Sequence, residues 1–108
     1  MKREFSNFQE FFPFYLSQHQ NKTNQYLHAF GTTLTLIIWT IALSTQMYWL
    51  FPVGLIQGYA WAWVGHFCFE KNKPATFKHP FYSLIGDTFM YYYVISGQID
   101  RKSEELLI

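Results

Sequence analysis

The chain has 108 residues, enough for one domain, and 50% of them are hydrophobic, 22% aromatic and 14% charged. Soluble domains carry about 25% charged residues, so this composition points away from an ordinary soluble protein. The net charge of +1 gives no indication of nucleic-acid binding, and the single cysteine, Cys68, excludes an internal disulfide and a cysteine-rich zinc site. We expect one domain over residues 1–108, no cleaved signal peptide, and Cys68 as a small buried hydrophobe.

Residues 4–18 place aromatic side chains at spacings of three and four, which predicts an amphipathic helix. Pro13 either kinks this helix or begins its second half. The aromatic face either lies toward lipid in the membrane interface or packs against the other helices, and the pattern fits both arrangements equally well.

Residues 23–69 contain no Asp, Glu, Lys or Arg. This run is too long for one membrane span and about right for two. We predict a first span over 24–45, an apex near 44–49 and a second span over 51–69 with Pro52 in its first turn. Such a hairpin returns to the membrane face where it began. It therefore brings His28 and His66 to the same depth.

A polar loop follows over residues 71–80, where two prolines exclude a long helix. The next apolar segment, 81–95, is short for a span and contains Gly86 and Asp87. A broken or re-entrant helix, or two short helices, fits it better than a straight span.

The predicted fold class is all-α. We expect a small integral membrane bundle with an interfacial N-terminal helix, a two-span hairpin and the short broken segment. Positive charge gathers at the N-terminus, at Lys22 and in the 71–78 loop, while the apex has none. The positive-inside rule then places the histidine end on the cytoplasmic side, of an inner membrane in a bacterium or of the ER membrane in a eukaryote.

Polar residues gather at both ends of the charge-free run. Asn24 and His28 share a helix face at i, i+4, and so do His66 and Glu70. His19 must come from a preceding turn or from the end of the first helix, and Asn21 or Thr23 could cap the helix that follows.

A third group is formed by His79 and Asp87. Asp87 is an acid inside an apolar segment and so a functional-site candidate. Ordinary structural roles also fit the polar residues: histidines at lipid headgroups, asparagines as caps, Glu70 as a solvated charge, and Asp87 paired with a lysine.

The hairpin brings His19, His28 and His66 toward one side. A metal site and the ordinary structural roles therefore fit these three histidines equally well. Imidazole and carboxylate ligands without a thiolate leave iron, zinc, manganese and copper open.

Residues over roughly 12–93 carry a family resemblance. They are, in order, Tyr15, Leu16, Ser17, Gln18, His19, Asn21, Asn24, His28 and Gly31, then Gly65, His66, Glu70, Lys71, Asn72, Lys73, Pro74 and Ala75, then Pro80, Tyr82, Ser83, Leu84, Gly86 and Asp87. In this ordered combination the chain resembles the fungal metabolism-of-phytosphingosine protein family and its bacterial relatives. Fungal members are ER-membrane, Fe(II)-dependent dioxygenases that shorten 2-hydroxy fatty acids by one carbon.

The resemblance implies an iron enzyme that cleaves the C1–C2 bond of a 2-hydroxy fatty acid with O2, in contact with membrane lipids. The resemblance implies His19, His28 and His66 as the essential metal ligands, whereas His79 is a further candidate ligand at a position that varies in the family. Glu70 would either ligate the metal directly or orient its ligands, as Asn21, Asn24 and Asp87 would. Lys71, Lys73 and Lys78 could attract the anionic head group.

Other functions stay open on the sequence: a haem- or metal-binding membrane protein without oxygenase activity, a structural or lipid-binding module, and a zinc hydrolase or isomerase. Acyl chain length, metal identity and oligomeric state are not determined by the sequence.

Overall fold

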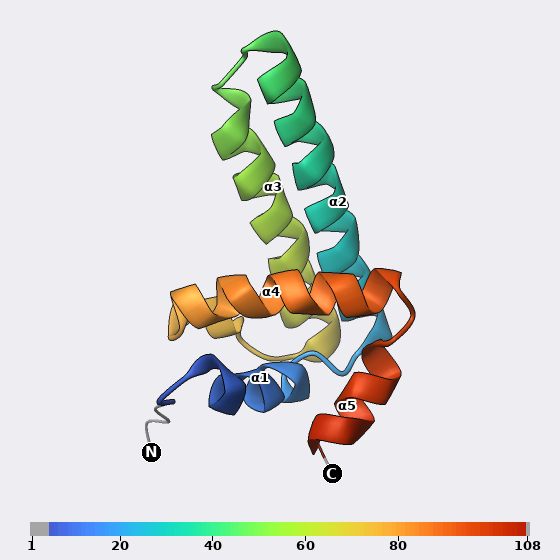
Figure 1. Cartoon of the computed structure of the whole chain (residues 1–108). Helices are drawn as coiled ribbons and strands as arrows, with labels where there is room; N and C mark the ends of the chain where they lie inside the picture. Colours follow the sequence, from blue (N-terminus) through green and yellow to red (C-terminus); the bar gives the residue numbers. More distant parts are fainter. Residues whose placement is uncertain (1–4, 108) are drawn as a thin grey trace.

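The computed structural model describes residues 5–107, and every regular element in that range is helical (Figure 1). In chain order the elements are α1 (Phe8–Ser17), α2 (Lys22–Thr45), α3 (Leu50–Val64), the π-helix η1 (Gly65–Glu70), the 3₁₀ helix η2 (Ala75–Phe77), α4 (Pro80–Ile95) and α5 (Ile99–Leu107). The all-α prediction is confirmed.

Helices α2 and α3 form an antiparallel hairpin that rises from a base made by α1, α4 and α5, with α4 lying crosswise against the lower part of the hairpin (Figure 1). The molecule measures 46 × 30 × 26 Å along its principal axes. Gln46 ends α2 in the left-handed conformation, with φ of 59°, and α3 begins at Leu50. The predicted reversal of the chain into a helical hairpin, with its apex near residues 44–49, is therefore confirmed.

Small residues let the two helices of the hairpin pack closely. A Cβ on Gly31 would lie 3.1 Å from the carbonyl oxygen of Gly58. Thr35 Oγ1 donates to the Gly54 carbonyl at 2.8 Å, and Gln57 Nε2 donates to Thr35 Oγ1 at 2.8 Å. Close backbones joined by side-chain hydrogen bonds are typical of helix pairs that cannot rely on burial from water.

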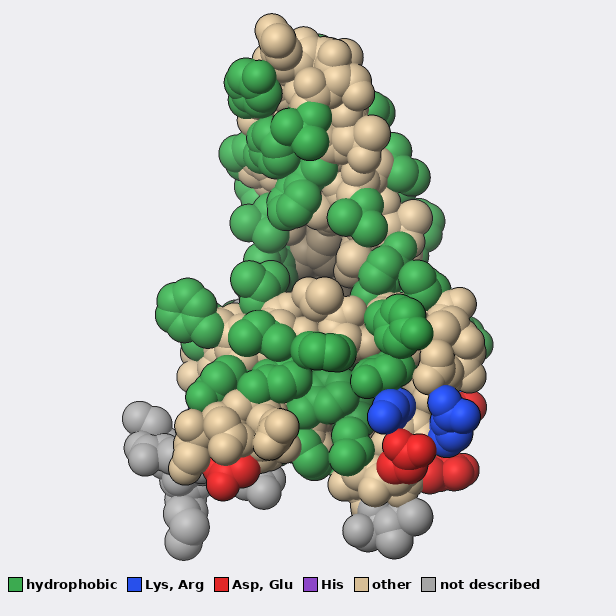
Figure 2. Space-filling view, in the orientation of Figure 1, with side chains coloured by type: hydrophobic (Ala, Val, Ile, Leu, Met, Phe, Trp, Pro, Cys, Tyr) green, Lys and Arg blue, Asp and Glu red, His purple; other side chains and the backbone are tan. Residues whose placement is uncertain are grey.

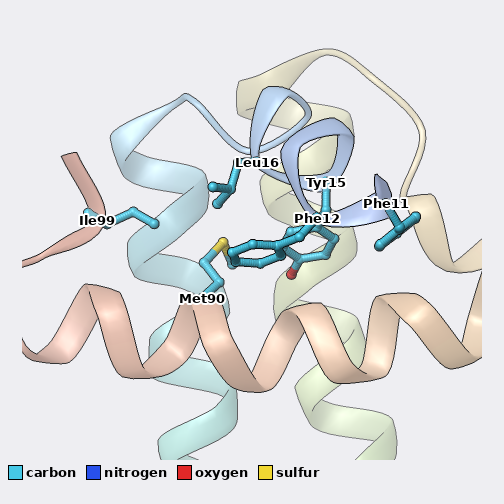
Figure 3. Packing of buried hydrophobic residues seen from close by; sticks show 6 residues of the cluster. All are labelled: Phe11, Phe12, Tyr15, Leu16, Met90 and Ile99. Carbon is cyan, nitrogen blue, oxygen red and sulfur yellow. The ribbon is translucent and has the colours of Figure 1, made fainter. Parts of the chain in front are cut away.

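The apolar core lies in the base, where α1 packs against α4 and α5. Its buried members are Phe11, Phe12, Tyr15, Leu16, Met90 and Ile99 (Figure 3). The aromatic face of α1 thus packs against protein, which decides between the two arrangements that the sequence allowed. Pro13 lies inside α1 without interrupting it.

The broken helix predicted for residues 81–95 is wrong, because α4 is one continuous helix. Pro80 occupies its first turn, where a missing N–H costs nothing. Gly86 does not break the helix; it makes room for an aromatic ring, since a Cβ there would lie 3.0 Å from the ring of Tyr15. Asp87 accepts a hydrogen bond from the same tyrosine.

The second predicted span is divided in the structure, because α3 passes into the π-helix η1 at Gly65. Gly65 and His66 are buried on the inner side of η1, whereas Cys68 is exposed on its outer side. The expectation of a buried Cys68 is therefore wrong.

Only α2, among the described helices, is long and apolar enough to cross a membrane. The window that meets this test is 17% buried inside the molecule. Ala42 is the only apolar side chain of α2 and α3, both fully described, that is buried. Charged side chains in the view of Figure 2 lie at the base, and the hairpin above them carries apolar groups.

Candidate metal centre

Three buried histidines meet where the hairpin joins the base. The ring centroids are 4.8 Å apart for His19 and His28, 4.4 Å for His19 and His66, and 5.0 Å for His28 and His66. One ring nitrogen of each lies within 4.8 Å of the other two. The prediction that the hairpin gathers these imidazoles is confirmed.

His19 comes from the turn between α1 and α2, as its spacing from His28 required. Its N–H donates to the Leu16 carbonyl at 3.0 Å, and its own carbonyl accepts from Gln25 Nε2 at 2.6 Å. His19 Nδ1 lies 2.7 Å from the carbonyl oxygen of Tyr15. Since a carbonyl only accepts, Nδ1 carries the hydrogen. Nε2 then holds a lone pair, and it is buried without a partner.

His66 is oriented by Asn72, the second residue after η1 ends. The left-handed backbone at Lys71, with φ of 63°, turns the chain back so that Asn72 Oδ1 lies 2.7 Å from His66 Nδ1. The side-chain nitrogen Nδ2 of Asn72 donates to the backbone carbonyl oxygen of Gln18 at 3.0 Å and to its side-chain Oε1 at 3.2 Å. Its oxygen therefore accepts from His66 Nδ1, which leaves His66 Nε2 as the free nitrogen.

His28 faces Asp87 across the junction. His28 Nδ1 lies 4.0 Å from an Asp87 carboxylate oxygen, and His28 Nε2 is buried without a partner. Asp87 also accepts from the hydroxyl of Tyr15. Burial raises the pKa of the Asp87 carboxyl to about 7, although the Tyr15 hydrogen bond acts in the opposite direction.

Burial also disfavours positive charge in the cluster. It lowers the pKa of His19 well below the usual 6.5, and the nearby His28 and His66 lower it further. Imidazolium ions at these separations would repel one another, so protonation of one ring opposes protonation of the next. Neutral imidazole is the form that binds a metal ion.

The donor set fits a metal ion. Buried nitrogens without partners are rare in folded proteins and call for an explanation. Here three neutral imidazoles, from the α1–α2 turn, α2 and η1, each offer a lone pair into one space. An acceptor holds the opposite ring nitrogen of His19 and of His66, as in many metal sites. The cavity among them is about 20 Å³, enough for one ion or one water.

Glu70 lies outside the group of three histidines. One of its carboxylate oxygens accepts from the N–H of Asn21 at 2.9 Å and from Asn24 Nδ2 at 3.0 Å, and the other accepts from the N–H of Gln20 at 3.2 Å. Asn21 also caps α2 by accepting from the N–H of Asn24 at 3.1 Å. Glu70 therefore fixes the chain between His19 and His28.

His79 also lies apart from the group. It is half-buried, with ring centroids 5.3 Å from those of Phe5 and Phe11 and 6.2 Å from that of Phe14. The three candidate head-group lysines are exposed: Lys71, Lys73 and Lys78.

Three further residues of this region had no assigned role at the sequence level: Tyr15, Asn72 and Ser83. Ser83 Oγ is buried without a partner on the wall of the histidine cavity. All three belong to the segments that carry the family resemblance, which was the only signal for them. Neither charge nor periodicity marks a neutral residue that acts through one hydrogen bond.

A protein-family model described as 2-hydroxy-palmitic acid dioxygenase Mpo1-like matches residues 5–99. The chain belongs to the Mpo1-like family. The Mpo1-like match includes the three histidines and the residues that hold them. No curated protein and no solved structure matches the chain. The resemblance read from the sequence is confirmed at the level of the family.

Proposed function

We propose that this protein is an iron-dependent membrane dioxygenase that cleaves the C1–C2 bond of 2-hydroxy fatty acids with O2 and shortens them by one carbon. The observation that carries the proposal is the convergence of three neutral imidazoles from separate segments of the chain, two of them with a buried nitrogen that lacks any partner. The description of the Mpo1-like family names a dioxygenase and 2-hydroxy-palmitic acid, and the proposal takes the reaction type and the substrate class from it.

In this proposal His19, His28 and His66 hold Fe(II). Three imidazole ligands leave positions open on the metal. When bound, Fe(II) would supply activation of O2 and Lewis-acid binding of the substrate's carboxylate and hydroxyl oxygens. Glu70, Asn21 and Asn24 keep the His19 turn in place.

The other residues of the cavity serve the substrate head and its protons. Ser83 Oγ, buried and without a partner, is free to donate to a head-group oxygen. The Tyr15 hydroxyl donates a hydrogen bond to the Asp87 carboxylate beside His28, so this pair can hold a proton next to the proposed metal position. Exposed Lys71, Lys73 and Lys78 attract the anionic head toward the site.

The hairpin would carry the site at the surface of a bilayer. Outside lipid it would expose apolar side chains along most of its length, since only Ala42 among its apolar residues is buried. Residues 50–70, which run from α3 through η1, would extend about 30 Å at helical rise, the thickness of the hydrocarbon core. The base with its charges then lies on the cytoplasmic side.

The test is to purify the protein in detergent, load it with Fe(II) without oxygen, quantify bound metal and add 2-hydroxypalmitate and O2. We expect one iron per chain and a product one carbon shorter. His28→Ala should lose both metal and turnover, whereas His79→Ala should keep both. Absence of bound metal together with absence of the shortened product would defeat the proposal. Turnover without O2, or a Soret band, would favour the zinc or haem alternatives.

A further inference from the structure

A second, larger cavity adjoins the histidine cavity. Its volume is about 260 Å³, and it lies between α2, α3 and α4. We call it the hairpin groove. It shares four lining residues with the histidine cavity: His28, Tyr59, Ala62 and Asp87. A molecule that fills the groove would therefore end beside the proposed metal position.

The groove is elongated along the hairpin. On α2 its lining runs from His28 to Trp39, and on the antiparallel α3 it runs from Ala62 to Leu55. The separation of His28 and Trp39 is about 16 Å at 1.5 Å per residue. Polar groups of the site lie at one end. Leu36, Trp39 and Leu55 line the other end, toward the apex.

The groove is open along its side. Leu36 and Leu55 are 48% and 44% exposed, so in a bilayer the groove would open toward lipid tails. An acyl chain could then enter the groove sideways from the membrane. The head must stay in the groove, beside His28 and Asp87, because the histidine cavity of about 20 Å³ holds only one ion or one water. A carboxylate with a neighbouring hydroxyl is far smaller than a phospholipid head.

We infer that the hairpin groove binds the acyl chain of a free fatty acid and that its length sets the preferred chain length. The inference rests on the proposed function for the identity of the head group. A methylene of an extended chain advances about 1.3 Å, given C–C bonds near 1.5 Å, so the groove covers roughly a dozen methylenes between His28 and Trp39. Burial of each methylene is worth roughly fourfold in affinity.

The first test narrows the far end of the groove. The double variant Leu36→Phe with Leu55→Phe places larger side chains on opposite walls. Its matched control, Ile37→Phe with Ile56→Phe, alters the next residue on each helix; these are 50% and 68% exposed and do not line the groove. The groove variant should lower kcat/KM for a long substrate relative to a short one about 15-fold, the effect of unburying two methylenes. The control should keep the wild-type ratio. An unchanged ratio in the groove variant would overturn the inference.

The second test does not depend on turnover. Fatty acids without the 2-hydroxyl, brominated near either the carboxyl or the methyl end, are titrated into the whole chain under nitrogen. Bromine quenches the fluorescence of nearby tryptophans. The part of the quenching that wild type shows and Trp39→Phe does not therefore reports contact with Trp39. Bromine near the methyl end should quench Trp39 more strongly than bromine near the carboxyl, because Trp39 lines the end of the groove toward the apex, and quenching should saturate at one molecule per chain. Unlabelled fatty acid should displace it.

The outcomes separate the two proposals. Saturable, position-dependent quenching without any shortened product would keep the groove and defeat the dioxygenase. Quenching that does not saturate, or that is equal for both bromine positions, would show contact with bulk lipid or detergent only and overturn the groove. Displacement of the brominated fatty acid by phospholipid, to the same extent as by unlabelled free fatty acid, would also overturn the groove.

Discussion

The three histidines have different partners beside the cluster. A backbone carbonyl holds Nδ1 of His19 and an amide oxygen holds Nδ1 of His66, while the Asp87 carboxylate lies 4.0 Å from Nδ1 of His28. The first two bonds fix the tautomer and the plane of the ring, and so aim Nε2 at the shared space. The site thus depends on neutral partners as much as on the imidazoles.

Asn72 should prove a positioning residue for His66. Asn72→Ala removes the acceptor on Nδ1, so we expect Fe(II) affinity to fall about 10- to 100-fold. Asn72→Asp keeps an acceptor and should restore part of the affinity, although it loses the donors to Gln18. Metal titration in detergent measures the effect, and circular dichroism checks that the helices remain. Equal affinity in wild type and Asn72→Ala would rule out this role.

Glu70 should act through the α2 turn rather than as a ligand. Glu70→Gln replaces an acceptor oxygen by a donor nitrogen and weakens bonds that a carboxylate makes to three N–H groups. The metal-free protein should lose about 1–3 kcal/mol of unfolding free energy, measured by denaturation in detergent.

A matched control for that variant is Glu104→Gln on the exposed side of α5, which should change little. If Glu70→Gln abolished metal binding while leaving the metal-free protein as stable as wild type, Glu70 would instead be a direct ligand.

At the scale of elements, the sequence predicts helices well where a periodic or charge-free segment is long. It predicts them less well where a residue contacts a partner that is far away in the chain. The hairpin and its apex follow from the charge-free run. The break expected in α4 did not occur, because Gly86 and Asp87 contact Tyr15, which lies in α1. A single sequence contains the pair but not their contact.

The contact between α2 and the start of η1 should control the metal site. A Cβ on Gly65 would overlap Asn24 Oδ1 and lie 3.2 Å from Asn24 Cα, which is backbone and cannot yield easily. Gly65→Ala should therefore push η1 away from α2. We expect a loss of about 1–3 kcal/mol in unfolding free energy and weaker metal binding.

Gly97→Ala provides the contrast. Gly97 has φ of 76°, and a Cβ added there would have no atom within 4 Å. The variant therefore bears only the cost of left-handed backbone, at least about 1 kcal/mol. Its metal affinity should equal that of wild type. Equal metal affinity in Gly65→Ala as well would show that the α2–η1 contact does not hold the site.

For the whole molecule, the arrangement of charge carries information that composition alone lacks. The charge-free run and its flanking histidines were enough to predict that His19, His28 and His66 meet, because chain reversal is a geometric consequence. They were not enough to find Asn72 or Ser83, whose roles depend on loop conformation and on one hydrogen bond each. The sequence also could not reveal the hairpin groove, since its walls come from three helices.

Membrane topology gives the last prediction, and the chain carries its own probe. Cys68 is the single cysteine and is exposed on η1, at the base of the hairpin. If the positive-inside rule applies, a membrane-impermeant maleimide should label it in inverted vesicles and not in right-side-out vesicles. Ser44→Cys in a Cys68→Ser background puts a probe of similar size near the apex, and this one should label with the opposite preference.

The pair of probes makes each outcome decisive. The preferences should be opposite because residues 44 and 68 lie at the two ends of the hairpin, which would be separated by the hydrocarbon core. Labelling of both from the same side would mean that the hairpin does not cross the membrane. Opposite labelling with Cys68 on the outer side would keep the crossing and reverse the orientation, which would place the histidine cluster outside the cytoplasm.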